Sequence, residues 1–201
     1  MSTKKHLDLG CGKRPRNPFL CAEVHGVDVY APMAGSEANP NYKSANLVLE
    51  PIPHADNTFD SISAFDFIEH IPRILPDGQG GTRFPFIELM SEIWRVLKPG
   101  GLFYAVTPAY PKAEAFQDPT HVNIITDKTH DYFCRDFTYT KNYGFSGQFN
   151  CLEAKWVFPR LALTAEPSLK KSYRSFVRSC LKGQTKTHFL WHLEAVKPSH
   201  P

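Results

Sequence analysis

Near the start of the chain, a short apolar segment, His6–Gly12, ends in an acid and two glycines. Such a run is typical of a buried parallel strand that enters a tight turn. Gly10 and Gly12 allow positive φ angles and the close approach of a ligand to the backbone. A second strand that ends in an acid, Gly26–Val29, follows about 18 residues after the first glycine. The pair predicts a nucleotide-like cofactor at the carboxyl ends of two parallel strands.

Further motifs follow this pair in a fixed order along the chain: Asn46-Leu47, Asp56–Asp60, Ile68–Ile71 and Trp94–Gly101. With them, residues 5–108 resemble the class I S-adenosylmethionine-dependent methyltransferases, of the type 11-like, Rossmann-like kind. Each motif alone is common, but the ordered set is specific. Lys13–Arg16 stands where a dinucleotide site would have a third glycine and a helix N-terminus for the pyrophosphate. S-adenosylmethionine has no phosphate, so the resemblance implies this cofactor rather than NAD.

The resemblance also implies roles for single residues. Asp8 would orient the methionine end of the cofactor through its amino group, and Asp28 would accept from both ribose hydroxyls. Asn46 would accept from the adenine amino group, and Leu47 would pack on the adenine face. The expected cofactor contacts are Asp8, Gly10, Cys11, Gly12, Asp28, Val29, Asn46, Leu47, Ala64 and Phe65. The alternatives are that the acids only cap turns and that Asn46 bonds to its own backbone.

The order of apolar, helical and loop segments predicts an α/β fold with right-handed crossovers. Strands are expected at Lys5–Leu9, Glu23–Val29, Ala45–Leu49, Phe59–Phe65 and Leu102–Thr107, and near Phe149–Phe158 and Thr187–Val196. Helical spacing predicts helices over Phe86–Leu97 and Ser168–Lys182. Two prolines between residues 13 and 22 predict a short or missing helix there.

The length of 201 residues, with 42% hydrophobic and 21% charged residues, fits one globular domain. The family implies a Rossmann-like domain over residues 1–201. Its seven-stranded sheet would be mostly parallel with an antiparallel last strand, and helices would cover both faces. Residues 5–108 would form the cofactor-binding half, and residues 109–201 the acceptor side and the C-terminal strands.

A segment stiffened by proline, Asp118–His121, follows the fifth expected strand and would face the reactive methyl group. An acid and a histidine on a stiff loop suit general-base chemistry, so Asp118 and His121 are the expected catalytic residues. The alternative is a capped surface turn. His70 is expected to be structural, and four aromatic side chains could wall an acceptor pocket: Tyr110, Phe116, Tyr132 and Phe133. A metal is not expected, because the spacing of the potential ligands matches no zinc pattern: Asp118, His121, His130, Asp131 and Cys134.

Methyl transfer is an in-line displacement, and a base is needed only when the acceptor arrives protonated, as a hydroxyl does. His121 therefore favours O-methylation of a small hydroxylated molecule, such as a sugar or another metabolite. Methylation of RNA or protein is the alternative, although Phe65–Ile68 departs from the Asn/Asp-Pro-Pro-Tyr/Phe motif of nucleobase-amine methyltransferases. A second alternative is a module that binds S-adenosylmethionine without catalysis.

Charge and cysteine content limit the expected partners. The net charge of +3 is too small to indicate nucleic acid, and the basic residues between 170 and 186 are expected to form a solvated helix face. Five cysteines without C-x-x-C spacing indicate a reducing compartment. No apolar run approaches the roughly 18 residues of a membrane span. We therefore expect a cytoplasmic protein with a small-molecule acceptor and neither a membrane nor a nucleic-acid partner; the oligomeric state stays open.

Overall fold

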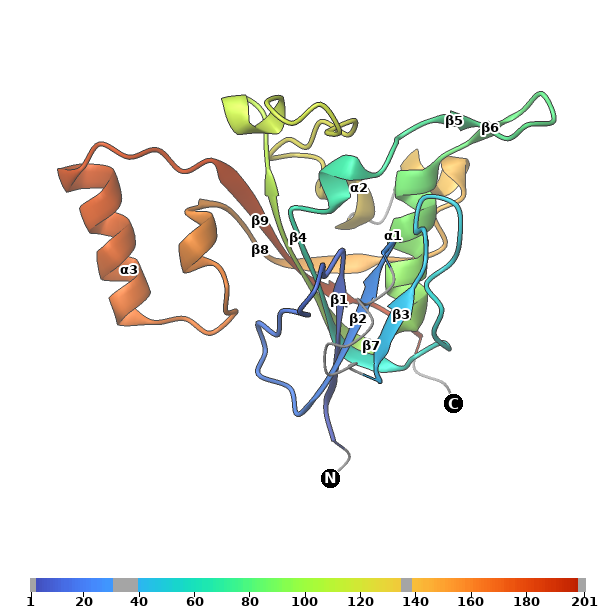
Figure 1. Ribbon diagram of the computed structural model, residues 1–201, viewed down its shortest axis with the longest axis horizontal. Coiled ribbons are helices and arrows are strands. Elements are labelled where there is room, and N and C mark those ends of the chain that lie inside the picture. Colours follow the sequence, from blue (N-terminus) through green and yellow to red (C-terminus); the bar gives the residue numbers. More distant parts are fainter. Residues whose placement is uncertain (1–2, 31–39, 135–138, 199–201) are drawn as a thin grey trace.

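The computed structural model describes residues 3–30, 40–134 and 139–198. A seven-stranded sheet forms its centre (Figure 1). Its strands are β1 (Lys5–Leu9), β2 (Glu23–Asp28), β3 (Tyr42–Ser44), β4 (Phe59–Phe65), β7 (Leu97–Pro108), β8 (Phe149–Val157) and β9 (His188–Ala195). Their order across the sheet is β3-β2-β1-β4-β7-β9-β8, and β9 runs antiparallel to both of its neighbours. The first five strands in this order pair in parallel, so the predicted sheet with its antiparallel last strand is confirmed.

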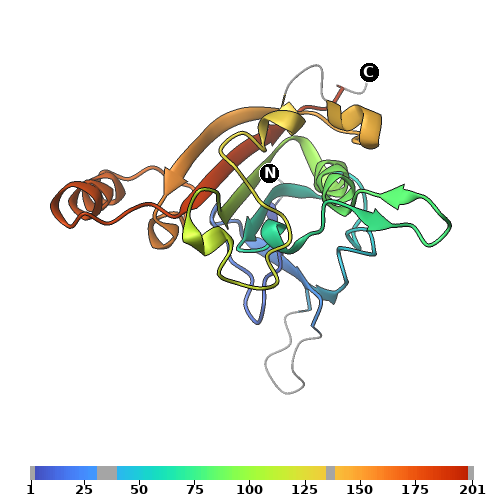
Figure 2. The ribbon, with the colours of Figure 1, turned by 90° about the horizontal axis from the view of Figure 1, so that it is seen from above.

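Helices lie on both sides of this sheet, and α1 and α3 stand on opposite sides of it in Figures 1 and 2. They are α1 (Pro85–Val96), α2 (Asp131–Cys134) and α3 (Leu169–Phe176), with short helical turns at Ile68–His70, Ala113–Ala115, Tyr139–Tyr143, Pro159–Leu161 and Val177–Leu181. The predicted Rossmann-like α/β fold is therefore confirmed. A separate hairpin of β5 (Leu75–Pro76) and β6 (Thr82–Arg83) projects beyond the N-terminus of α1.

The two faces of the sheet carry different side chains because residues alternate along each strand. On one face, Leu7 and Leu9 of β1 belong to the main core that α1 completes. The helix buries apolar residues three and four apart: Phe86, Leu89, Met90 and Ile93. On the other face, the segment of residues 13–22 forms no helix, and its Phe19 packs edge-on against Tyr104.

The third strand lies earlier than predicted, at Tyr42–Ser44 rather than Ala45–Leu49. Residues after it form a turn in which the N–H groups of Leu49 and Glu50 donate to the Asn46 carbonyl. Ala45 and Leu47 are buried on either side of Asn46. This turn, which packs on the core, therefore shows the same alternation of apolar and polar residues as a half-buried strand.

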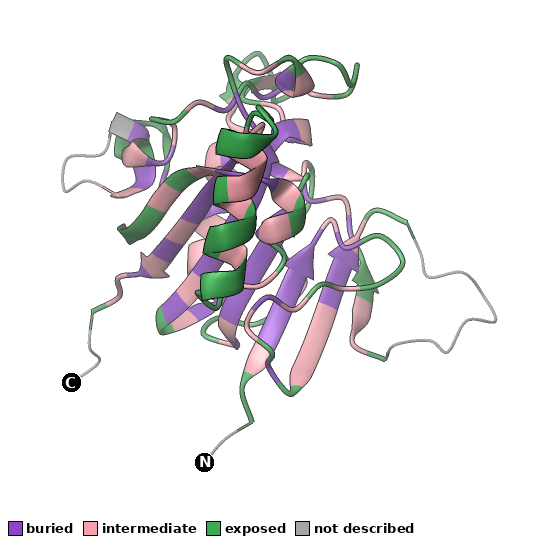
Figure 3. Cartoon of the chain, turned by 90° about the vertical axis from the view of Figure 1, so that its left-hand side faces the viewer, coloured by how far each residue is buried: buried purple, intermediate pink, exposed green. Residues whose placement is uncertain are grey.

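The amphipathic helix α3 turns the side that bears Lys171 toward the protein, whereas Lys170 and Arg174 are exposed. Lys171 Nζ donates to the Thr164 carbonyl at 2.7 Å, and the Arg178 guanidinium of the following turn lies 5.6 Å from the ring centre of Phe158. The opposite stripe is solvent-exposed (Figure 3): Leu169, Tyr173 and Phe176 are 91%, 69% and 56% exposed. The prediction of a solvated basic face is therefore wrong for two of its residues. Among the described residues, no helix has the length and apolar content to cross a membrane.

Candidate active site

A buried polar network lies at the centre of the sheet, where β1 and β4 pair in register. His6 faces Ser61, and Asp8 faces Ser63, on the same side of the sheet. Ser63 Oγ donates to Asp8 Oδ1 at 2.6 Å and so accepts from His6 Nε2 at 2.9 Å. His6 Nδ1 then accepts from Ser61 Oγ at 2.8 Å. The His6 imidazole in this network is therefore neutral, with Nε2 as the donor and Nδ1 as the acceptor.

Burial controls the charges of this network. It lowers the pKa of His6 to about 4 and raises the pKa of Asp8 to about 6. The second oxygen of Asp8 accepts from the backbone N–H of Arg16 at 2.7 Å. A carboxylate that burial destabilises gains from a cationic ligand group, so Asp8 suits the ammonium of a methionine moiety. The sequence-based prediction did not include His6, Ser61 and Ser63, which support Asp8. The available signal was that polar residues alternate with apolar ones in both strands.

The glycine turn follows β1 and hydrogen-bonds to the carboxyl end of β2. Gly10 and Gly12 have φ angles of +62° and +57°, as predicted. A Cβ atom on Gly10 would lie 2.3 Å from the Phe67 ring, so this position also needs glycine for space. The N–H of Gly12 donates to Asp28 Oδ2 at 2.8 Å, and that of Tyr30 lies 3.2 Å from Oδ1. The two predicted strand-end acids therefore flank one turn, and their contacts with a cofactor stay predictions.

Other predicted cofactor contacts surround this turn. The buried thiol of Cys11 has its pKa raised to about 12 by burial, which keeps it neutral. Val29 is exposed beyond β2, and Ala64 is buried in β4. The carbonyl of Phe65 accepts from Arg16 Nη1 at 3.1 Å, and the same guanidinium lies 4.9 Å from the Phe65 ring centre.

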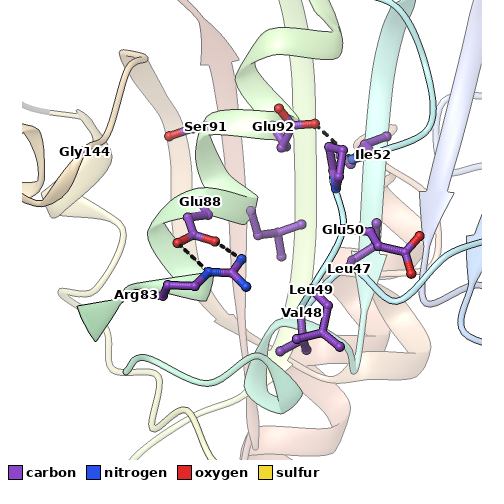
Figure 4. A pocket seen from close by; sticks show the side chains of 12 residues that line it. Leu47, Val48, Leu49, Glu50, Ile52, Arg83, Glu88, Ser91, Glu92 and Gly144 are labelled. Atoms are coloured by element: carbon purple, nitrogen blue, oxygen red, sulfur yellow. Dashed lines mark hydrogen bonds and ion pairs between the residues drawn. The ribbon is translucent and has the colours of Figure 1, made fainter. Parts of the chain in front are cut away.

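The predicted adenine contacts lie in the turn after β3. Asn46 Oδ1 accepts from the N–H of Val48 at 3.1 Å, which is the local bonding left open as the alternative. Leu47 is buried in the main core. It also lines a cavity of about 310 Å³ between this turn and α1, shown in Figure 4, where Glu92 accepts from the Ile52 N–H at 2.9 Å.

A second cluster forms where the ends of β4 and β7 meet the loop that follows β7. Glu69 lies in the turn after β4, and its side chain is 1% exposed. Its Oε2 accepts from Thr107 Oγ1 of β7 at 2.8 Å. The N–H groups of Val122 and Asn123 donate to the Glu69 carbonyl at 3.0 and 2.9 Å. These bonds hold His121 beside Glu69, although 52 positions separate the two residues in the sequence.

Within this cluster, His121 Nε2 lies 3.9 Å from Glu69 Oε1, and the His121 ring centre lies 4.8 Å from that of His70. Burial raises the pKa of Glu69 to about 7. The expectation that His70 is structural stays a prediction, and Glu69 was missed. The Glu-His pair after the fourth strand was the available signal, but its partner His121 is fixed only by tertiary structure.

Asp118 takes a different position. Its Oδ1 accepts from Thr120 N–H at 2.8 Å and Thr120 Oγ1 at 2.6 Å, and these bonds lower the pKa of Asp118. Its Oδ2 lies 4.0 Å from His121 Nε2. A lowered pKa makes a weak base, so Asp118 matches the capped turn better than a proton acceptor. His130 packs against Trp191 of the core, with ring centres 6.0 Å apart.

A larger cavity of about 580 Å³ lies beside this loop, between it and the start of α1. Tyr132 and Phe133 line it, as the aromatic content of the segment suggested. Tyr110 and Phe116 do not, because they pack against each other on the surface with ring centres 6.4 Å apart.

Comparisons with known proteins agree with this geometry. Residues 7–105 match the family model described as a methyltransferase domain. The chain is 31% identical over 113 residues to a sterol 24-C-methyltransferase of Gibberella zeae, a match that covers 49% of this chain and 26% of that protein. The chain thus spans about a quarter of the length of this curated relative.

Solved structures share the fold. A chain of the complex between the Haloferax volcanii Trm112 methyltransferase activator and a putative methyltransferase aligns with a TM-score of 0.57 and 14% identity, over 100% of this chain and 85% of that one. An S-adenosylmethionine-dependent methyltransferase of Mesorhizobium loti aligns with a TM-score of 0.55 and 14% identity, over 96% and 91% of the two chains.

The strand order, the glycine turn and these matches define a class I methyltransferase fold, the class that uses S-adenosylmethionine. Residues 7–105, just under half of the chain, are the part that matches the methyltransferase domain.

Proposed function

We propose that this chain transfers the methyl group of S-adenosylmethionine to a hydroxyl oxygen of a small molecule, such as a sugar or another metabolite. The observation that carries the proposal is the buried pair of His121 Nε2 and Glu69 Oε1, 3.9 Å apart. A hydroxyl must lose its proton during methyl transfer, and this pair offers the means beside the predicted cofactor site.

The arrangement of strands supports this role. β1, β4 and β7 are consecutive in the sheet, so the Asp8 end of the cofactor site and the Glu69–His121 pair lie at neighbouring strand ends. The acceptor oxygen would attack the methyl carbon while the carbon–sulfur bond breaks and its electrons return to sulfur. The carbon is already activated, so the protein mainly aligns the two partners, excludes water and takes up the hydroxyl proton.

The cavity of about 580 Å³ would hold the body of the acceptor. Arg73 lines it and donates through Nε to Asn123 Oδ1 at 2.6 Å, and the N–H of Asn123 bonds to Glu69. This chain of contacts links the cavity to the catalytic cluster. Aromatic walls with a few polar groups at the edge favour an acceptor with an apolar part. Residues 109–201 would thus contribute one wall of the acceptor side.

Two observations concern the macromolecules that could bind this chain. Lys171 and Arg178 of the basic stretch bind their own chain, which reduces the positive surface offered to RNA. The Haloferax volcanii structure contains the activator Trm112, and we propose a protein activator as a partner of this chain as well. We also infer a cytoplasmic location, which the five free cysteines support.

A turnover assay tests the proposed function. The purified chain is incubated with S-adenosylmethionine and panels of hydroxylated small molecules, RNA or protein, and released S-adenosylhomocysteine is measured. We expect turnover with a hydroxylated small molecule and none with RNA or protein at physiological salt. Turnover with RNA alone, falling steeply as salt rises, would contradict the choice of acceptor. Tight cofactor binding without turnover on any panel would favour the non-catalytic module.

A further inference from the structure

We propose that Glu69, His70 and His121 form a binding site for a first-row transition-metal dication, such as zinc or a neighbouring metal. Each residue offers one ligand atom, and these three atoms lie within 4.8 Å of one another. Among the described residues, no other such group of three forms. The cation's part in catalysis rests on the function proposed above, whereas the existence of the site does not.

The carboxylate of Glu69 is the first reason for a cation here. Its Oε1 atom is fully buried and has no hydrogen-bond partner, while Oε2 already accepts from Thr107. A buried polar atom without a partner is costly and rare in folded proteins. The unpartnered oxygen points toward His121 Nε2, and a cation between these two atoms would satisfy both.

Both imidazoles are oriented as metal ligands usually are. His121 Nδ1 lies 3.3 Å from the carbonyl of Ala115. His70 Nδ1 lies 3.3 Å from the carbonyl of Thr120 and 3.0 Å from its Oγ1. A carbonyl only accepts, so these contacts assign the proton of each ring to Nδ1 and leave a lone pair on Nε2. Ligating histidines typically donate their other N–H to such a carbonyl.

The distance between His121 and Glu69 fits an ion better than a direct bond. At 3.9 Å, Nε2 and Oε1 are too far apart for a hydrogen bond. Two ligands that each lie about 2.1 Å from one metal ion are separated by about 3–4.2 Å. The gap therefore matches the space that a bridging dication needs, and a small shift of His70 would complete the third bond.

The ligand types select the metal. Two imidazole nitrogens and one carboxylate suit zinc, iron, cobalt or nickel, whereas magnesium and calcium prefer all-oxygen sites. Three protein ligands leave at least one position open, as in catalytic rather than structural sites.

The open position would bind the acceptor hydroxyl. The cation would lower the pKa of that hydroxyl, and its proton would leave to solvent. The oxygen would then form a bond to the methyl carbon as the carbon–sulfur bond breaks, which gives the ether and neutral S-adenosylhomocysteine. With the cation bound, His121 would act as a ligand, and this role would replace the proton uptake that the His121–Glu69 pair would perform without the cation.

Cobalt(II) titration of the full, chelator-treated chain tests the site, with visible absorption as the readout and neither cofactor nor acceptor present. The exposed thiols of Cys151 and Cys180 are replaced by serine in every protein compared, because they could bind cobalt themselves. We expect one saturable site. His70→Ala, His121→Ala and Glu69→Gln should each weaken it by about 100-fold. The control His25→Ala removes a histidine that also pairs with an acid, at 2.7 Å from Glu23, and should leave binding unchanged.

The absence of saturable binding, or equal binding by the three ligand variants, would overturn the site. The folding of Glu69→Gln, which keeps the size of the side chain, is checked by thermal melting and by binding of S-adenosylhomocysteine. The titration contains no acceptor, so its failure would leave the methyl-transfer proposal standing. Unchanged turnover after treatment with a chelator would contradict a role of the cation in catalysis.

Discussion

His121→Ala lowers turnover by about 10²–10⁴-fold while the affinity for S-adenosylmethionine changes by less than about threefold. This result is expected because His121 lies in the loop after β7, with Nε2 3.9 Å from Glu69 Oε1, and not at the predicted cofactor contacts of β1 and β2. Its removal takes away either a proton acceptor or a metal ligand, and both act on the acceptor oxygen. The measurement is steady-state turnover with the acceptor found in the panel, combined with calorimetric titration of the cofactor.

Two further variants test this prediction, one expected to lose turnover and one expected to keep it. Glu69→Gln keeps the shape of its side chain and removes its charge, so turnover should fall to a similar extent. His25→Ala is the control, because His25 lies in β2 and pairs with Glu23 away from the cluster. Near-normal turnover of the His121 variant would remove this residue from the reaction and leave catalysis to alignment and exclusion of water.

Asp8→Asn lowers the affinity for S-adenosylmethionine by about 100-fold. The carboxylate of Asp8 is fully buried and would pair with the ammonium of the methionine moiety. Around it, Arg16 favours the charged form and Asp28 opposes it, while His6 stays neutral because its pKa is about 4. Ammonium binding requires the ionised carboxylate. Since burial raises the pKa of Asp8 to about 6, wild-type affinity should fall about tenfold per unit as pH drops below 6.

The stability of Asp8→Asn shows whether a loss of affinity comes from the binding site or from a loss of folding. The pKa of Asp8 rises from 3.8 to about 6 in the folded state, so the folded chain binds more protons between these values. Its ionisation therefore costs stability as pH rises through this range, by about 3 kcal/mol above pH 6. Asp8→Asn should melt at the same or a higher temperature at pH 7.5. Unchanged affinity, or affinity independent of pH in the wild type, would contradict the role of Asp8.

The fold was predictable because it depends on local patterns that recur in order. The bounds of β1 and β4 match the prediction, since short apolar runs bounded by polar residues define buried strands. The third strand was misplaced because Ala45 and Leu47 alternate in burial within a turn. The direction of α3 could not be predicted either: hydrophobic periodicity shows that a helix has two faces, but it does not show which face meets the protein.

The candidate site was predictable only in part. Asp8 and Asp28 end neighbouring strands, so the sequence placed both of them at one edge of the sheet. The partnership of Asp8 with Ser63 depends on strand register, which sequence alone does not determine. The pairing of Glu69 with His121 depends on backbone bonds from a distant loop, and a long loop has no periodic pattern that reports its path.

Calorimetric titration of S-adenosylhomocysteine and NAD into the purified chain tests most directly whether the ends of β1 and β2 form an S-adenosylmethionine site. Wild type should bind S-adenosylhomocysteine at one site with a free energy of about −7 to −8 kcal/mol and NAD far more weakly. Asp28→Ala should lose about 2–3 kcal/mol of that affinity, because two ribose hydroxyls lose their acceptor, while Asp127→Ala, at an exposed acid beyond β7, should bind as wild type does. Preference for NAD, or unchanged affinity in Asp28→Ala, would contradict the assignment of this site.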